Sequence, residues 1–301
     1  MRRARWTLPA ELLDGKRIAG EIRSEIAERV KKLVARGITP GLTVILVGDD
    51  AASAVYVAAK GKACEEAGMR GETIRLPAST SQKDLLSRVR GLNADDGVHG
   101  ILVQMPLPRQ LDADQVILAI DPNKDVDCFH PVNVGKMLIG GRDGFLPCTP
   151  AGIQEMLSRS GVKTSGKHCV IVGRSNIVGK PMAALMMQPG ERANCTVTVC
   201  HSGTKDLGAE TRRADILIAA TGKAGLITAE MVKPGAVVVD VGMNRVPDAG
   251  AKSGTRLVGD VEFEGVRQVA SLITPVPGGV GPMTIAMLLA NTVASAEKTR
   301  R

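Results

Sequence analysis

Aromatic residues are scarce in this chain. One tryptophan, one tyrosine and three phenylalanines occur among 301 residues. Aromatic side chains therefore cannot form much of a core, and Val, Ile, Leu, Ala and Met must fill the interior. At this length the chain can bury two such cores, and its 44% hydrophobic and 23% charged residues are ordinary for a globular protein. Long apolar runs are also missing, because no segment approaches the ~18 unbroken apolar residues of a membrane-spanning helix.

Paired cysteine motifs are missing as well. The six cysteines form no Cys-x-x-Cys pair, and most lie in apolar segments that predict helices or strands. This pattern favours reduced thiols and a cytoplasmic location over a disulfide framework, and it predicts no metal site. The segment from Met1 to Trp6 is basic, but no apolar core follows it, so it does not resemble a secretory signal.

Long basic runs are absent, although the net charge is +8. No basic stripe is interleaved with aromatic residues, which argues against a nucleic-acid partner. Two interpretations of the charge stay open: it serves solubility, or it attracts anionic ligands.

Apolar β-branched runs alternate with helical patterns along the whole chain. This order predicts an α/β fold with a doubly wound parallel sheet in each half, the second of them Rossmann-like. The expected helices are 12–36, 51–67, 82–92, 112–120, 150–160, 182–187 and 281–298, with a short one near 134–138, and the expected strands are 42–47, 72–76, 98–104, 168–172, 196–200, 215–219, 236–240 and, as a weaker candidate, 271–274.

The domain boundary is expected near residue 150. The first domain would comprise 1–150 and the second 151–280, and the C-terminal helix, 281–301, would pack back on the first domain. The irregular stretch 122–149 is long for a connection inside a compact domain, and such loops are often functional.

The stretch from His168 to Pro181 predicts a strand, a tight turn and a helix N-terminus. The apolar run ends at Val172, and Gly173, Arg174 and Ser175 follow at once. A helix start with free N–H groups and a positive dipole end binds anions well. The spacing is Gly-x-Ser-x-x-x-Gly, not Gly-x-Gly-x-x-Gly, so an ordinary βα turn stays open on the motif alone.

The next strand favours NADP over NAD. In a Rossmann unit this strand usually ends in a carboxylate that binds the ribose 2′-hydroxyl of NAD. Here the strand is followed by His201, Ser202 and Lys205, and Arg174 could form a bidentate pair with a 2′-phosphate. Small residues follow the later strands and would lie at the same sheet edge: Thr221, Gly222, Gly242 and Met243.

The first half carries a helix face with several reactive side chains. Spacings of three and four residues place Ser53, Tyr56, Lys60 and Cys64 on one face. A solvated Lys60 and a packed Tyr56 remain the ordinary alternative. Polar residues also follow the third strand and lie in the irregular stretch, namely Gln104, Asp125 and Asp127. The loop 274–284 is rich in Pro and Gly, which is typical of a loop that lines a ligand-binding site.

Together these motifs resemble the bifunctional methylenetetrahydrofolate dehydrogenase/methenyltetrahydrofolate cyclohydrolase family. The resemblance spans about Gly15 to Val293. Its most specific parts are Ala52-Ser-x-x-Tyr56-x-x-x-Lys60-x-Lys-Ala-Cys64, Val103-Gln-Met-Pro-Leu-Pro108, Lys124-Asp-Val-Asp127, Gly173-Arg-Ser-x-x-Val-Gly179 and Pro275-Val-Pro-Gly-Gly-Val-Gly-Pro-Met-Thr284.

The resemblance implies NADP-dependent oxidation of methylenetetrahydrofolate, followed by hydrolysis of the methenyl product to 10-formyltetrahydrofolate. It implies two α/β domains around a cleft, a homodimer, and a folate site in which Lys60 is catalytic, Tyr56 positions the folate, Gln104 supports Lys60 and Asp127 holds the pterin. Further folate contacts would be Ser53, Val103, Met105, Pro277, Gly278, Gly279, Val280 and Gly281, and the NADP contacts would be Gly173, Arg174, Ser175, Ser202, Thr221, Gly222 and Met243.

Two other functions stay open: a dehydrogenase of the same family without cyclohydrolase activity, and a non-catalytic NADP-binding regulatory protein. The chain also departs from the family pattern at three places. Ala51 stands where proline is usual, Cys128 stands where glycine usually follows Asp127, and 188–194 is longer than usual.

Overall fold

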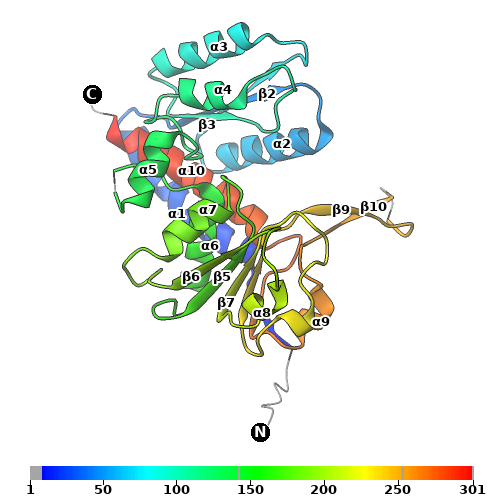
Figure 1. The fold of residues 1–301 in the computed structure, drawn as a ribbon. Helices are drawn as coiled ribbons and strands as arrows, with labels where there is room; N and C mark the ends of the chain where they lie inside the picture. The colour runs from blue at the N-terminus through cyan, green and yellow to red at the C-terminus, as the bar shows by residue number, and fades with distance from the viewer. Residues whose placement is uncertain (1–8, 142, 252–253, 300–301) are drawn as a thin grey trace, which may run out of the picture. The chain divides into compact units, whose positions relative to one another are not determined.

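The computed structural model describes residues 9–141, 143–251 and 254–299 (Figure 1). The basic segment from Met1 to Trp6 lies outside the described residues. The chain divides into two compact units. One contains the residues up to Ile18 and Thr149–Thr284, and the other contains Ala19–Cys148 and the residues from Ile285 onward.

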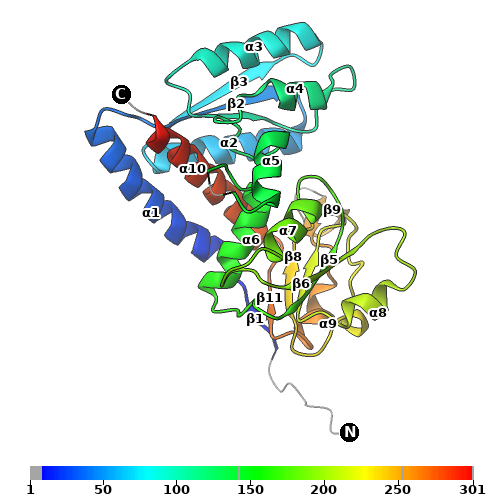
Figure 2. The ribbon, with the colours of Figure 1, turned by 60° about the vertical axis from the view of Figure 1, so that its left-hand side comes forward.

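The unit of Ala19–Cys148 is built on a three-stranded parallel sheet in the order β3-β2-β4. The central strand, β2 (Gly41–Val47), is buried at every position, as its unbroken apolar sequence requires in a sheet covered on both faces. Helices α3 and α4 cover one face and α2 the other (Figures 1 and 2). The bounds of these elements are α2 Ala51–Glu66, β3 Arg70–Leu76, α3 Gln82–Ala94, β4 Gly100–Val103, α4 Ala113–Ala119 and α5 Pro131–Leu138.

The unit of Thr149–Thr284 is built on a six-stranded sheet in the order β1-β11-β8-β7-β5-β6, and all its neighbours are parallel. Val170, Leu217 and Val238 from the central strands lie in its core, which is aliphatic as the composition predicts. The bounds are α6 Cys148–Arg159, β5 His168–Val172, α7 Gly179–Met186, β6 Thr196–Cys200, α8 Leu207–Thr211, β7 Ile216–Ala219, η1 Ala229–Met231, β8 Val237–Asp240, α9 Phe263–Arg267 and β11 Leu272–Ile273.

Two long helices, α1 (Gly15–Ala35) and α10 (Val280–Lys298), contain the unit boundaries at Ile18 and Thr284. The predicted α/β fold with parallel sheets is confirmed. The assignment of 1–150 and 151–280 as functional domains stays a prediction. Among the described residues, no helix combines the length and the apolar character needed to cross a bilayer.

Two features were not predicted from the sequence. Strand β1 (Glu11–Leu12) pairs with β11 at the edge of the six-stranded sheet. Its two residues are too few to produce a periodic pattern. Strands β9 (Asn244–Pro247) and β10 (Thr255–Val258) form an antiparallel hairpin that projects from the sheet (Figure 1). Pro247 lies within β9, and proline is uncommon inside strands, which hid the hairpin.

Candidate functional site

The centre of the first candidate site is Lys60 on α2. Its side chain is buried, with 8% of its surface exposed, and Nζ donates a hydrogen bond of 3.0 Å to Oε1 of Gln104. Gln104 follows β4 directly and is fixed twice. Its backbone N donates to the Ile45 carbonyl (2.8 Å), and its Nε2 donates to the Met105 carbonyl (2.8 Å). The lysine therefore meets an oriented amide rather than solvent.

Helix α2 is positioned by a cap at its first turn. The carboxylate of Asp50 accepts a hydrogen bond of 2.7 Å from the backbone N of Ser53. Such a cap satisfies one of the free N–H groups of a helix start. It is compatible with Ala51 in the position where proline is usual. Ser53 is buried, and Tyr56, one turn before Lys60, is partly buried.

Asp127 and Cys148 complete the surroundings of Lys60. Burial lowers the pKa of Lys60, and the charge of Asp127 opposes this shift. Burial raises the pKa of Asp127, and Lys60 opposes it in turn. Burial therefore disfavours the charge of both groups, and each charge supports the other; the residue Asp127 as a whole is partly exposed. The sequence analysis predicted Lys60, Gln104 and Asp127 as one site, and the structure brings their side chains together.

Cys148 was not predicted as a site residue. It is the first residue of α6, its Sγ lies 3.3 Å from the Val126 carbonyl, and Nδ2 of Asn291 lies 3.7 Å from the sulfur. Burial, followed by the charge of Asp127, raises the pKa of the thiol well above its ordinary value. Cys148 is therefore a neutral thiol. Its sequence neighbourhood, Pro147-Cys-Thr-Pro150, gave no spacing signal for chemistry.

The charged residues of the loop 124–127 have separate tasks. Nζ of Lys124 donates to the carbonyls of Leu92, Asn93 and Asp95 at 3.0, 2.8 and 2.8 Å, which fixes the loop to the end of α3. Asp125 accepts hydrogen bonds from the backbone N of Phe129 (3.1 Å), the backbone N of His130 (2.9 Å) and Nδ2 of Asn133 (2.9 Å). Of the charged residues in this loop, Asp127 is the one whose charge acts on Lys60.

Cys128 adopts the backbone conformation of a glycine. Its φ is +61°, in the left-handed region, and its buried Sγ donates to the Phe145 carbonyl at 3.1 Å. The usual glycine at this position has a physical reason, because only glycine adopts this conformation without cost. The thiol contact fixes the residue after Asp127 against the segment that leads to α6.

The second candidate site lies at the carboxyl edge of the six-stranded sheet, in the turn between β5 and α7. Gly173 has φ of +130°, and a Cβ there would overlap the Ala220 carbonyl. A Cβ at Gly179 would overlap the Gly173 carbonyl. The backbone of the turn is thus packed as closely as glycine allows. This is the arrangement expected where a backbone approaches phosphate groups.

In this turn the side chain of Ser175 stabilises the local fold, whereas the side chain of Arg174 is accessible to a ligand. Oγ of Ser175 accepts from the backbone N of Val178 (3.1 Å) and of Gly179 (3.4 Å), so it holds the start of α7. Arg174 is exposed, and no described residue pairs with it. Ser202 is exposed beyond the tip of β6, and no carboxylate stands directly at that tip. This part of the edge has the basic and hydroxyl groups that the sequence predicted.

The tips of β7 and β8 are held by two aspartates that the sequence analysis did not assign. The backbone N–H groups of Thr221 and Gly222 both donate to Asp260, and Asp240 accepts from the backbone N of Gly242. Met243 follows with 43% of its surface exposed, which is high for a large apolar side chain. The signal that could have revealed Asp240 was its position at the end of a buried strand.

The Pro- and Gly-rich loop belongs to the same unit as this edge. Gly278 has φ of +109°, and its carbonyl accepts from the backbone N of Lys16 at 2.9 Å. Gly279 is buried against Thr274, and no room exists for a Cβ there. Pro277 is exposed and Val280 is the buried first residue of α10. In the other unit, Val103 is buried and Met105 is partly exposed.

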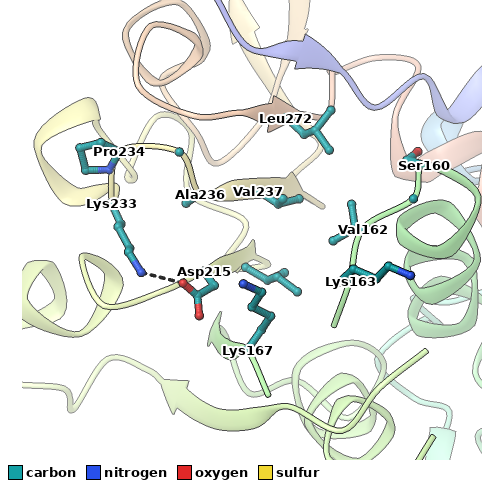
Figure 3. A pocket seen from close by; sticks show the side chains of 13 residues that line it. Ser160, Val162, Lys163, Lys167, Asp215, Lys233, Pro234, Ala236, Val237 and Leu272 are labelled. Carbon is teal, nitrogen blue, oxygen red and sulfur yellow. Dashed lines mark hydrogen bonds and ion pairs between the residues drawn. The ribbon is translucent and has the colours of Figure 1, made fainter. Parts of the chain in front are cut away.

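A further hollow of about 280 Å³ lies at the opposite, amino edge of the six-stranded sheet (Figure 3). Its only carboxylate, Asp215, already pairs with Lys233 at 2.6 Å and accepts from the backbone N of His168 at 3.0 Å. Lys163 extends away from Asp215 in this view. The carboxylate is thus already engaged by its own neighbours, and within the described residues no group of His, Cys, Asp and Glu could hold a metal.

Comparison with known proteins relates the two parts of the chain to one family. Residues 13–127 match the sequence model of the tetrahydrofolate dehydrogenase/cyclohydrolase catalytic domain, and residues 147–300 match that of the NAD(P)-binding domain of the same family. A bifunctional FolD protein from Chlorobium limicola is 61% identical over 289 residues, which cover 95% of this chain and 98% of that protein.

Two solved structures are similar over nearly the whole chain. The bifunctional FolD enzyme from Campylobacter jejuni is 50% identical, with a TM-score of 0.91 over 96% of this chain and 99% of that one. The Trypanosoma brucei methylenetetrahydrofolate dehydrogenase-cyclohydrolase, solved with NADP cofactor and an inhibitor, is 41% identical, with a TM-score of 0.91 over 96% and 98% of the two chains. The chain therefore belongs to the tetrahydrofolate dehydrogenase/cyclohydrolase family.

Proposed function

We propose that this protein is a bifunctional enzyme of one-carbon metabolism. It oxidises methylenetetrahydrofolate to methenyltetrahydrofolate with NADP and hydrolyses that product to 10-formyltetrahydrofolate. The observation that carries the proposal is the hydrogen bond of 3.0 Å between the buried Lys60 and Gln104, beside the enclosed Asp127. A dehydrogenase without cyclohydrolase activity, or a regulatory protein that only binds NADP, would have no use for a desolvated lysine held in this way.

Lys60 is suited to move a proton at the reacting carbon. An ordinary lysine, with a pKa of about 10.4, is almost fully protonated at neutral pH and is a poor base. Burial lowers the pKa of Lys60, and the positive charge of methenyltetrahydrofolate would lower it further. Nζ can then accept a proton from the attacking water and return it as the ring opens. Gln104 orients Nζ, and Asp127 keeps the protonated form accessible.

The folate would contact residues from both halves of the sequence. Tyr56 would stack on it, and Asp127 would bind the pterin. The remaining contacts that we propose are Ser53, Val103, Gln104, Met105, Pro277, Gly278, Gly279, Val280 and Gly281. The partly buried Tyr56 and the backbone carbonyl of Met105, which orients Gln104, support this assignment.

NADP is the cofactor, and the carboxyl edge of the six-stranded sheet fits it. The closely packed glycines at 173 and 179 allow phosphate groups to approach the backbone. When bound, NADP accepts a hydride from the folate. Gly173 and Ser175 would contact the phosphates, Arg174 and Ser202 would bind the 2′-phosphate, and Thr221, Gly222 and Met243 would line the rest of the site.

We also propose that the enzyme is a cytoplasmic homodimer. All six cysteines are buried and unpaired, which suits a reducing compartment. The dimer rests on the family resemblance, and sedimentation equilibrium of the purified protein tests it directly: a monomer mass at micromolar concentration would refute it.

The function is tested by absorbance at 340 nm with methylenetetrahydrofolate and either NADP or NAD, followed by acid conversion to detect formyl product. NADP reduction together with formyl product is expected. Accumulation of methenyl product alone would favour a monofunctional dehydrogenase, and NADP binding without turnover would favour a regulatory protein.

Lys60→Met tests the role of the lysine. It should abolish cyclohydrolase activity and leave NADP binding near normal. Lys62→Met is the matched control, because Lys62 lies on the same helix with 76% of its side chain exposed. Full cyclohydrolase activity in Lys60→Met would exclude Lys60 as the proton carrier.

Arg174→Ala tests cofactor choice. Loss of the guanidinium should weaken NADP binding at least tenfold, the size of one charge-assisted pair, and should change NAD binding far less. Titration of the two nucleotides measures both dissociation constants, and an equal loss for both would exclude a 2′-phosphate contact.

A further inference from the structure

Asp240 and Asp260 are two buried carboxylates at the carboxyl edge of the six-stranded sheet. We propose that they are positioning residues for the dinucleotide: together they hold the turns after β7 and β8 in the shape that binds NADP. This inference rests on the NADP-dependent function proposed above. It assigns to both aspartates an action through the turns that they fix, not through contact with the cofactor.

Asp260 fixes the turn after β7. It lies beyond β10, is fully buried, and accepts at Oδ2 from the backbone N of Thr221 (2.5 Å), Oγ1 of Thr221 (3.0 Å) and the backbone N of Gly222 (3.0 Å). Its Oδ1 accepts from Nδ2 of Asn244 at 2.9 Å, just past the tip of β8. One carboxylate thus connects the two turns, and the amide groups of 221 and 222 are not free to bind phosphate.

Asp240 fixes the segment that carries Asp260. It is the last residue of β8, and its carboxylate accepts from the backbone N of Gly242 (2.9 Å), Asp260 (2.8 Å) and Val261 (2.9 Å). Its own backbone N donates to Oγ1 of Thr274 at 2.7 Å. A strand end of the sheet therefore sets the position of the loop from which Asp260 reaches the next turn.

Two glycines, which have no Cβ, allow these segments to pack closely against the two aspartates. A Cβ at Gly259 would overlap the Asp240 carboxylate, and one at Gly242 would overlap Asp260. On the other side of the turn after β7, the Ala220 carbonyl occupies the space where Gly173 would carry a Cβ. A shift of Thr221 would therefore pass through Ala220 to the glycine turn that receives the phosphates.

The burial of two carboxylates destabilises the fold, which indicates that the arrangement is kept for a function. Buried carboxylates cost free energy, and backbone N–H groups offset only part of that cost. For Asp240, burial raises the pKa to about 6 despite three hydrogen bonds to its carboxylate. Apolar residues could fill the same volume more cheaply, but they could not fix three backbone segments at once.

The test is Asp260→Ala, with NADP binding measured by calorimetry and both substrates measured by steady-state kinetics. We expect the dissociation constant for NADP to rise at least tenfold, with kcat at saturating NADP and KM for methylenetetrahydrofolate changed less than twofold. Asp260→Asn keeps one acceptor oxygen for the two amides and should recover most of the affinity. Hydrogen exchange at the amides of 221 and 222, measured without cofactor, should become faster in Asp260→Ala.

Glu262→Ala is the matched control, because Glu262 lies two residues further on and its carboxylate caps α9 through the backbone N of Gly265 (2.9 Å). It should leave NADP affinity unchanged. Unchanged affinity in Asp260→Ala, or an equal rise of both substrate constants, would overturn the inference. If Asp260→Ala does not fold, Asn244→Ala removes only the bond to Oδ1, and unchanged affinity there would overturn it. Failure of the unmodified enzyme to bind NADP would instead refute the proposed function.

Discussion

At the scale of single residues, burial and the charge of Asp127 have opposite effects on the proton affinity of Lys60. Burial lowers the pKa of Lys60, and Asp127 raises it. In Asp127→Asn the raising contribution is lost, so the pKa of Lys60 should fall further and the neutral amine should persist to lower pH. The pH at which cyclohydrolase activity reaches half its maximum should therefore move to lower pH, alongside a lower maximal rate.

A pH profile of formyl production with methenyltetrahydrofolate measures this shift. Asp143→Asn is the control, because it removes an exposed carboxylate that pairs with Lys136. A profile that keeps its midpoint in Asp127→Asn would show that the two groups are not coupled during the reaction.

Cys128 makes a second residue-scale prediction, because its φ of +61° suits glycine. Cys128→Ala keeps the Cβ in the left-handed region and loses the thiol contact with Phe145. Cys128→Gly loses the same contact but removes the backbone cost, which is about 1 kcal/mol. The larger unfolded-state entropy of glycine offsets part of this gain, so the glycine variant should be the more stable of the two by less than about 1 kcal/mol. Urea unfolding of both variants measures the difference, and a more stable alanine variant would contradict it.

At the scale of elements, two glycines of the same unit should respond oppositely to alanine. Gly100 opens β4, where a Cβ would lie 2.9 Å from Oγ1 of Thr292 on α10 and from Cγ2 of Val126. Gly91 lies on the exposed side of α3 with nothing within 4 Å of a Cβ. Gly100→Ala should lower the free energy of unfolding by about 1–3 kcal/mol, and Gly91→Ala should raise it by about 0.5–1 kcal/mol.

Thermal and urea unfolding of the two variants test this pair, since each controls for the other. If Gly100→Ala were neutral, β4 and α10 would not pack as closely as the structure has them.

Elements were predictable from the sequence where their pattern was long. The unbroken apolar run of β2 and the periodic helix α1 were found within a few residues of their bounds. Strand β1 has only two residues and therefore no periodic pattern. It is a strand because it pairs with β11, which lies far away in the sequence. Local patterns cannot reveal such a strand.

The same distinction between local sequence patterns and long-range contacts applies to the candidate site. Lys60 and Gln104 were predictable because helix spacing and strand ends place them. Cys148 and Asp260 were not, because their partners, Asp127 and Thr221, approach only through tertiary packing. The roles proposed for the site residues stay predictions until the variants are measured.

At the scale of the whole molecule, strand β1 has a consequence for how the protein is made. Residues 11–12 leave the ribosome before the other strands of this sheet, but their partner, β11 at 272–273, is synthesised after all of them. The six-stranded sheet cannot form this edge until β11 has emerged. A nascent chain stopped before β11 should therefore remain protease-sensitive in this unit, and the synthesis of β11 should decide when the enzyme acquires its cofactor-binding half.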